Sequence, residues 1–312
     1  MSSTSAASSG RRDTAPGSAA PAPRGSRTVL LRAEDGVPIE AAYRPGPGPG
    51  APAIVVAHGF TGALERPAIR RAATVFAQRA GVVTFSFRGH GGSGGRSTVG
   101  DREVLDLAAA VAWARSLGHA RVATVGFSMG GSVVLRHGAL YRAEAQGGER
   151  ERGGRTGAYG NAAAGGGGDG APGRGPVSYA DAVVSVSAPA RWFYRGTAPM
   201  RRLHWIVERR TGRAVSRLAL KTRVHHRRWN PVPLSPTAAV PRIAPAPLLI
   251  VHGTRDGYFP LDHPEALAAA AAPGAAELWL EEDFGHAENA ASDELLTRIA
   301  TWASEAVSER SP

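Results

Sequence analysis

Short apolar segments recur along the chain without the strict alternation of apolar and polar residues that half-exposed strands show. Such segments are typical of strands buried on both faces, as in a parallel sheet. Six are expected, at residues 53–58, 81–87, 121–127, 180–187, 247–253 and 276–282. An earlier pair, 29–31 and 37–43, flanks Asp35-Gly36 and predicts an antiparallel hairpin, because Asp-Gly supplies the positive φ of a tight turn.

Helical patterns lie between these strands. They predict helices at about residues 66–80, 102–117, 129–144, 261–272 and 289–308. Strands that alternate with helices imply right-handed βαβ units, so we expect an α/β protein with a mostly parallel central sheet and helices on both faces. Functional residues should then lie at the carboxyl ends of the strands.

Three segments depart from this alternation. Residues 1–26 are rich in Ser, Ala and Pro and are expected to be a disordered tail, which leaves one domain over residues 27–312. Residues 146–177 are glycine-rich and too polar to bury a core, so a flexible insertion is expected. Residues 188–243 are too long for an ordinary connection and contain three tryptophans, so a folded cap is expected.

Composition limits the chemistry. The 312 residues are 43% hydrophobic, enough for a substantial core, and include no cysteine. Thiol catalysis and cysteine-based zinc sites are therefore excluded, and a nucleophile must be oxygen or nitrogen. The sequence has neither a secretory apolar run nor the ~20 apolar residues of a membrane span, so a cytoplasmic protein is the default expectation.

The formal net charge of +11 would ordinarily suggest nucleic acid or an acidic membrane as partner. All but one of the 37 basic residues are arginine, however, and alanine and glycine are also abundant. A GC-rich genome produces the same bias through codon choice. We therefore expect no nucleic-acid partner, and the sequence leaves the oligomeric state open.

Residues 126–130, Gly-Phe-Ser-Met-Gly, match the G-x-S-x-G pattern of a nucleophile on a sharp strand-to-helix turn. In a chain with 40 glycines this pattern also arises by chance, and residues 91–95 match it as well. Only Ser128 follows a buried strand and precedes a helical segment, whereas Ser93 lies in a glycine loop. Ser128 is thus the candidate nucleophile, with a helix N-cap serine as the structural alternative.

A serine nucleophile needs a base, and the base needs an orienting acid. His286 lies on the loop after the last predicted strand, and Asp256 follows the strand before it, so both are expected at the same edge as Ser128. Asp283 is the alternative acid. The oxyanion donors are expected to be the backbone N–H groups of Phe60 and Met129.

Five motifs together, "VVAHGF", "FRGHGGSGG", "GFSMGG", "HGTRD" and "GHAE", resemble the α/β-hydrolase superfamily. Within it, the short HGF loop and "FSFRGHGGSGG" are most similar to the feruloyl/cinnamoyl-esterase, acylglycerol-lipase and serine-aminopeptidase-like branches. The resemblance covers about residues 28–142 and 180–308. The sequence departs from the family pattern at Ser86, two residues before Arg88, where relatives often carry an acid. This difference puts one contact with a loop in doubt, but it does not affect the catalytic roles.

The resemblance implies an α/β-hydrolase fold with the cap inserted before the strand that leads to Asp256. It also implies attack of Ser128 on a carboxylic ester, an acyl-enzyme, and its release by water activated by His286, with neither cofactor nor metal. An amidase or peptidase of the same fold, and a catalytically silent binding protein, remain as alternatives.

The cap carries a concentration of charge that genome bias does not explain. Residues 190–230 contain twelve basic residues and one acid, Glu208. The net charge of this stretch, +11, therefore equals the net charge of the whole protein. Trp192, Trp205, Arg201 and Arg202 are the candidate substrate-binding residues of the cap. An anionic substrate or an anionic lipid surface is a possible partner, and a helical cap with a solvated basic face is the alternative.

Overall fold

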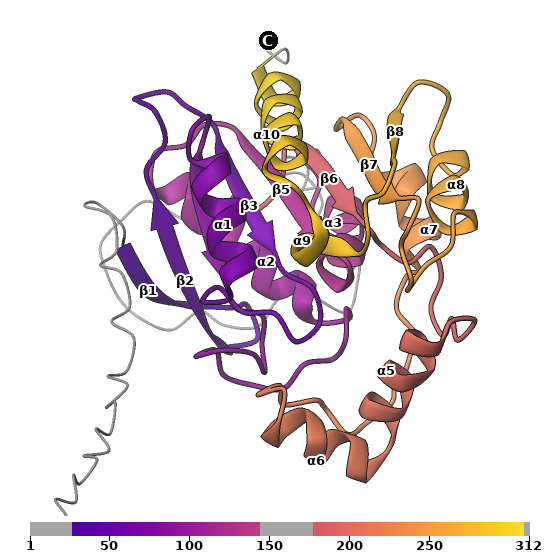
Figure 1. Cartoon of the computed structure of the whole chain (residues 1–312). Helices are drawn as coiled ribbons and strands as arrows, with labels where there is room; N and C mark the ends of the chain where they lie inside the picture. Colours follow the sequence, from indigo (N-terminus) through magenta and orange to yellow (C-terminus); the bar gives the residue numbers. More distant parts are fainter. Residues whose placement is uncertain (1–26, 144–176, 309–312) are drawn as a thin grey trace, which may run out of the picture.

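The computed structural model describes residues 27–143 and 177–308. The expectations for the tail at 1–26 and for nearly all of the insertion at 146–177 lie outside the described residues. Within them, one eight-stranded sheet runs through the molecule in the order β1-β2-β4-β3-β5-β6-β7-β8 (Figure 1). Its strands are β1 Arg27–Arg32, β2 Pro38–Arg44, β3 Ala53–Ala57, β4 Gly81–Phe85, β5 Val122–Phe127, β6 Ala182–Val186, β7 Leu248–Gly253 and β8 Ala276–Glu281.

The sheet is mostly parallel, as predicted. β1 and β2 form the antiparallel hairpin, β2 pairs antiparallel with β4, and every pairing from β4 to β8 is parallel. The helices are α1 Pro67–Phe76, α2 Glu103–Ser116, α3 Met129–Leu140, α5 Ala198–Glu208, α6 Arg210–Leu218, α7 Pro236–Ala239, η1 Val240–Arg242, α8 Asp262–Ala269, α9 Ala287–Ala290 and α10 Asp293–Ser308.

Helices cover both faces of the sheet, so the predicted α/β class is confirmed. Alternate residues of each strand point to opposite faces. Val55 of β3 belongs to one apolar cluster with Leu107 of α2 and side chains of α3 and α8. Its neighbour Ile54 belongs to the other cluster, with Ile299 of α10 and side chains of α1.

The prediction of one continuous helix at residues 289–308 is wrong. The chain forms α9 and α10, which are separated at Ala291, where the backbone is extended with φ −62° and ψ 129°. The Oγ atom of Ser292 then accepts a hydrogen bond from the N–H of Leu295 at 3.1 Å. A serine at this position offers the new helix an N-terminal cap, which favours a fresh start over continuation.

The segment between β6 and β7 forms the cap, in which α5 and α6 extend beyond the edge of the sheet, while α7 and η1 pack on α3 (Figure 1). Backbone and side-chain hydrogen bonds hold the far end of the cap to the loop after β4. Ser97 N–H donates to the carbonyl of Arg223 at 2.7 Å, and His225 N–H donates to the carbonyl of Ser97 at 2.8 Å. The Nε1 atom of Trp229 donates to the carbonyl of Thr98 at 2.7 Å.

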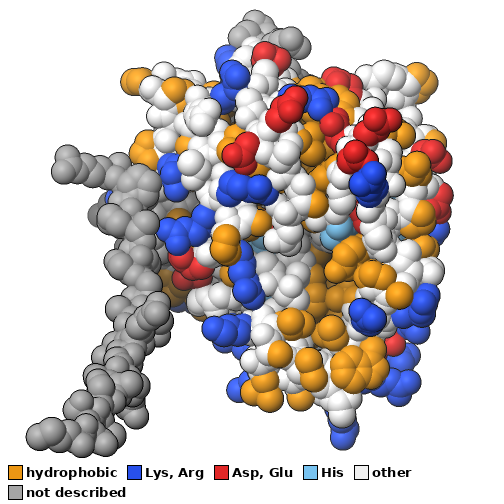
Figure 2. Space-filling model, viewed as in Figure 1, with side chains coloured by type: hydrophobic (Ala, Val, Ile, Leu, Met, Phe, Trp, Pro, Cys, Tyr) orange, Lys and Arg blue, Asp and Glu red, His pale blue; other side chains and the backbone are white. Residues whose placement is uncertain are grey.

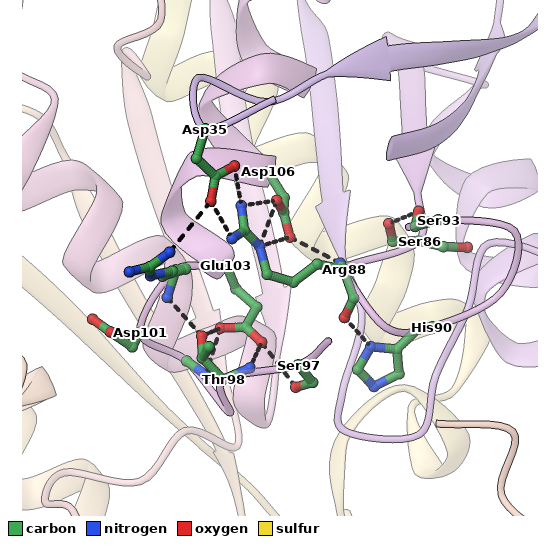
Figure 3. A network of polar contacts seen from close by, with 12 residues as sticks. Asp35, Ser86, Arg88, His90, Ser93, Ser97, Thr98, Asp101, Glu103 and Asp106 are labelled. Carbon is green, nitrogen blue, oxygen red and sulfur yellow. Dashed lines mark hydrogen bonds and ion pairs between the residues drawn. The ribbon is translucent and has the colours of Figure 1, made fainter. Parts of the chain in front are cut away.

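A buried ion pair stabilises the base of that loop (Figure 3). The guanidinium of Arg88 donates to both carboxylate oxygens of Asp106 at 2.7–3.1 Å and to Asp35 at 2.6 and 3.0 Å. Beside it, buried Glu103 accepts hydrogen bonds from the Ser97 hydroxyl and from the N–H groups of Thr98 and Gly100. These carboxylates fix the loop to which the cap is attached.

Arg88→Ala should lower the free energy of unfolding by about 3–5 kcal/mol, because it leaves the buried carboxyl of Asp106 without its partner. Urea denaturation measures the change. Arg70→Ala is the matched control, since its ion pair with Glu65 spans 3.8 Å and both side chains are about half exposed or more. The control should cost less than about 1 kcal/mol. Equal losses in the two variants would contradict a special contribution from the buried pair.

Candidate active site

Ser128 lies on a sharp turn between β5 and α3, with φ 52° and ψ −112°. The turn is possible because residues 126 and 130 are glycines. A Cβ atom on Gly126 would overlap the carbonyl of Gly130, and one on Gly130 would overlap the carbonyl of Ala57 at the end of β3. The turn therefore lies tight against the neighbouring strand and projects the Ser128 side chain from the carboxyl end of the sheet.

The structure brings Ser128, His286 and Asp256 together. The Nε2 atom of His286 lies 2.9 Å from the Oγ atom of Ser128, and its Nδ1 atom lies 2.8 Å from Oδ2 of Asp256. The hydroxyl of Ser128 makes no capping hydrogen bond to α3. With Nδ1–H donated to the carboxylate, Nε2 is free to accept the serine proton.

Asp256 is held as a carboxylate although its side chain is fully buried. Burial opposes ionisation, but the hydrogen bond from His286, the attraction to this ring in its protonated form, and the N–H groups of Tyr258 and Phe259 lower the pKa of Asp256 below the usual range. Those two N–H groups donate to Oδ1 at 2.7 and 3.1 Å. Oδ2 therefore remains available to His286.

Two neighbours fix the imidazole of His286. The ring of Tyr258 stacks on it with centroids 4.1 Å apart and an interplanar angle of 22°. The Oγ atom of Ser187, at the end of β6, accepts the N–H of Ala287 at 3.1 Å and so anchors the next residue. Neither contact could be identified from the sequence, because both join loops that are distant along the chain.

The two expected oxyanion donors have no hydrogen-bond acceptor among the described residues. Met129 is the first residue of α3, so its N–H has no acceptor within the helix. Among the described residues the N–H of Phe60 likewise has no acceptor. The loop before Phe60 passes beside the nucleophile, since a Cβ on Gly59 would lie 3.5 Å from the Cβ of Ser128.

A buried acid that the sequence analysis missed, Glu288, supports this loop. Its Oε1 atom accepts the N–H of Gly59 at 3.1 Å, and its Oε2 atom has no hydrogen-bond partner among the described residues. Burial raises its pKa. Its only signal in the sequence is its place two residues after His286, which does not reveal that it reaches the end of β3.

Within the described residues, the other serine that matches the pattern, Ser93, and the alternative acid, Asp283, make no hydrogen bond or ion pair with His286. Ser93 is buried, and its hydroxyl donates to the carbonyl of Ser86 at 2.5 Å and accepts the N–H of Glu40. Asp283 is exposed and pairs with Arg255 at 2.7 Å. Ser86 does not lose its loop contact, because its hydroxyl donates to the Glu40 carboxylate from β2 at 3.1 Å.

The neighbouring histidines have structural partners. His58 accepts the N–H of Phe87 on Nε2 at 3.0 Å and donates from Nδ1 to the carbonyl of Gly59, and burial lowers its pKa to about 3. The pKa of buried His90 is lowered to about 4. His252 is hydrogen-bonded to the carbonyl of Phe259 at 2.9 Å. These rings stay neutral and shape the loops.

A cavity of about 490 Å³ opens between Ser128 and the cap. Three aromatic side chains form part of its wall: Trp229 lies 5.1 Å from Trp192 and 5.5 Å from Phe193 between ring centroids. Met200, Leu203 and Val207 of α5 add apolar surface. The space next to the hydroxyl can therefore hold a bulky apolar group.

Of the four candidate substrate-binding residues of the cap, only one lines the cavity. Trp192 lines the cavity. Trp205, Arg201 and Arg202 do not line it and are exposed on the opposite side of α5. The sequence could not separate them, because the outer side of this helix is partly apolar as well.

Comparisons with known proteins agree on the fold. Residues 52–146 match the family described as "alpha/beta hydrolase fold", a stretch from β3 to the end of α3 that includes Ser128. A search of curated proteins gives no match.

Solved structures resemble the whole domain. An esterase from Pyrococcus furiosus is 20% identical with a TM-score of 0.62, over 90% of this chain and 91% of that one. The α/β-hydrolase GrgF from a Penicillium species is 16% identical with a TM-score of 0.59, over 91% and 99%. Est1E from Butyrivibrio proteoclasticus, solved with ferulic acid, is 16% identical with a TM-score of 0.53, over 90% and 99%.

The sheet order, the turn at Ser128 and these likenesses define the class: the chain has the α/β-hydrolase fold, as the sequence motifs implied. The cap precedes β7, which leads to Asp256, as expected for a cap inserted before that strand. Among the described residues, no helix combines the length and apolar character that crossing a membrane requires.

Glu288→Gln should gain stability relative to the wild type as pH rises. The unfolded carboxyl loses its proton near pH 4.5, whereas the buried group keeps it to higher pH. Between the two pKa values the native state binds more protons, so the wild-type free energy of unfolding falls as pH rises. The glutamine does not titrate and keeps an oxygen for the N–H of Gly59.

Urea denaturation at a series of pH values from about 4 to 8 measures this difference. The exposed Glu294→Gln on α10 is the control and should follow the wild type. A stability difference for Glu288→Gln that does not change with pH would contradict burial as the cause of the raised pKa.

Proposed function

We propose that the protein is a serine hydrolase that cleaves a carboxylic ester, with Ser128 as nucleophile, His286 as general base and Asp256 as the orienting acid. The observation that carries the proposal is the continuous hydrogen-bond series from Ser128 Oγ through His286 to Asp256. It lies at the mouth of an apolar cavity, where an acyl or alkyl group fits beside the hydroxyl.

In the first half-reaction, Ser128 Oγ attacks the ester carbonyl carbon as its proton passes to Nε2 of His286. The resulting imidazolium is stabilised by the Asp256 carboxylate. The oxyanion accepts hydrogen bonds from the N–H groups of Phe60 and Met129. When the tetrahedral intermediate collapses, the alcohol leaves with the proton from His286, and the acyl group stays on Ser128.

In the second half-reaction, His286 removes a proton from water, and the hydroxide attacks the acyl-enzyme. Collapse of the second intermediate releases the carboxylic acid and returns the proton to Ser128. Besides the ester and water, this cycle uses only side chains and backbone N–H groups of the protein. Glu288 takes no proton in it and acts only by holding Gly59, so we propose it as a positioning residue for the oxyanion loop.

Ser128→Ala and His286→Ala should each lower kcat for an aryl ester by on the order of 10⁶, because the nucleophile and the base act as one unit. Circular dichroism of both variants should match the wild type. Comparable turnover in the Ser128→Ala protein would place the nucleophile elsewhere.

Asp256→Asn should lower kcat by roughly 10⁴, because an amide cannot stabilise the imidazolium or fix its tautomer. Asp283→Asn is the matched control, since Asp283 is exposed and pairs with Arg255. The control should change kcat by less than about twofold. If Asp283→Asn were the more damaging, the assignment of the acid would be wrong.

A fluorophosphonate probe should label the wild type at Ser128 and leave Ser128→Ala unlabelled, because only an activated serine reacts. Parallel assays of an aryl ester and an aminoacyl amide with the same acyl group then compare kcat/KM. We expect the ester to be preferred by at least about tenfold. Absence of labelling would indicate a silent binding protein, and preference for the amide would indicate an amidase or peptidase.

A further inference from the structure

The helix α5 has two different faces. Met200, Leu203 and Val207 recur at helical spacing and point into the cavity beside Ser128. Trp205 lies on the other side, with Arg201 and Arg202 on the preceding turn, and Arg209 follows the helix as its C-terminal capping residue. We call the exposed residues of α5 and α6 that do not line the cavity the outer cap face; they include Arg201, Arg202, Trp205, Arg209, Arg210, Val215, Arg217 and Leu218.

Apolar side chains on the outer cap face are more exposed than packing requires. Leu218 is 80% exposed, Trp205 46% and Val215 44%. Figure 2 shows hydrophobic side chains gathered over the lower part of the molecule, where Figure 1 places the cap, with basic side chains next to them. One such residue would be unremarkable, but a group on two adjoining helices indicates a surface that meets a partner.

The charge of the outer cap face is almost entirely positive and uncompensated. The side chains of Arg202, Arg209, Arg210 and Arg217 have no hydrogen-bond or ion-pair partner among the described residues. The single acid of the two helices, Glu208, is already paired with Arg195 at 2.5 Å and with His204 at 2.9 Å. A partner for this face must therefore be anionic.

We propose that the outer cap face binds the surface of an anionic lipid bilayer. Clustered arginines attract anionic headgroups, while tryptophan and leucine side chains insert at the boundary between headgroups and acyl chains. A soluble anion or a nucleic acid would account for the arginines, but it offers no apolar phase for Leu218 and Trp205. The combination of both residue types on one exposed face favours the bilayer.

The location of this face adds a second consequence, which rests on the proposed function. The same helix that would lie on the membrane forms a wall of the cavity with its inner side. An ester dissolved in the bilayer would then have only the thickness of one helix to pass before reaching Ser128. The substrate class that fits is an ester of a membrane-partitioning acyl or alkyl chain.

Vesicle flotation tests the binding without any need for catalysis. Full-length Ser128→Ala protein is mixed with vesicles of phosphatidylcholine alone or with about one third phosphatidylserine. We expect at least about tenfold stronger binding to the anionic vesicles, since each basic residue near the surface contributes to attraction. Binding should weaken strongly when salt is raised from about 0.05 M to 0.5 M.

Two variants in the same background locate the surface. The first replaces four outer arginines by glutamine, in Arg202→Gln, Arg209→Gln, Arg210→Gln and Arg217→Gln. It should bind anionic vesicles at least about 100-fold more weakly. Its matched control removes the same charge outside the cap, in Arg27→Gln, Arg44→Gln, Arg66→Gln and Arg79→Gln, and should change binding less than about threefold.

The second variant, Trp205→Ala with Leu218→Ala, should bind at least about tenfold more weakly, because apolar insertion is lost. Leu30→Ala with Leu280→Ala is its control, since both leucines are exposed outside the cap. With Ser128 restored, turnover of a short, soluble, neutral ester checks that each cap variant retains an intact site.

Three results would overturn the proposal. Equal binding to neutral and anionic vesicles, or none to either, would exclude an anionic-lipid surface. Equal loss in the cap and control variants would show that overall charge, and not this face, is responsible. If vesicles do not bind and the four-arginine cap variant instead loses kcat/KM for a soluble anionic ester, the arginines recognise substrate. None of these results bears on whether Ser128 is the nucleophile, which the probe labelling tests separately.

Discussion

The constraint on which the site depends is the close approach of the Ser128 turn to the end of β3. Glycine at positions 126 and 130 lets the chain reverse from β5 into α3 while touching the carbonyls of Ala57 and His58. This single packing contact sets the hydroxyl, the first N–H of α3 and the loop of Gly59 and Phe60 next to one another. A side chain at either position would overlap a neighbouring carbonyl, so the turn could not keep this close approach.

Buried acidic side chains in this protein shape loops at the edge of the sheet. Glu288 holds the loop of Gly59, and Glu103 holds the loop at residues 97–100 that carries the cap. Arg88 neutralises the acids behind that loop. Each carboxylate accepts backbone N–H groups that have no strand or helix partner, and so it gives an irregular segment one defined conformation. The positions of the atoms that we propose to react therefore depend on polar groups outside the proposed cycle.

Features with a local cause could be predicted from the sequence. The strands followed from apolar runs, and the turn at Ser128 followed from two glycines, a preceding strand and a following helix. Contacts between distant loops could not be predicted, because nothing near Glu288 indicates Gly59 and nothing near Ser86 indicates Glu40. The break at Ala291 was missed because the apolar periodicity continues across it, while the cap at Ser292 decides where α10 begins.

In the cap, the sequence likewise does not show which side of α5 faces the cavity. Helical spacing in α5 identifies two stripes, one through Met200, Leu203 and Val207 and one through Arg201 and Trp205, but both contain apolar side chains. Only the position of the cavity determines which stripe is inward. Once that is known, Trp205 cannot be explained by contact with a substrate in the cavity. Together with exposed Val215 and Leu218 on the adjoining helix, this indole among arginines suits the proposed bilayer surface, which is apolar inside and anionic at its headgroups.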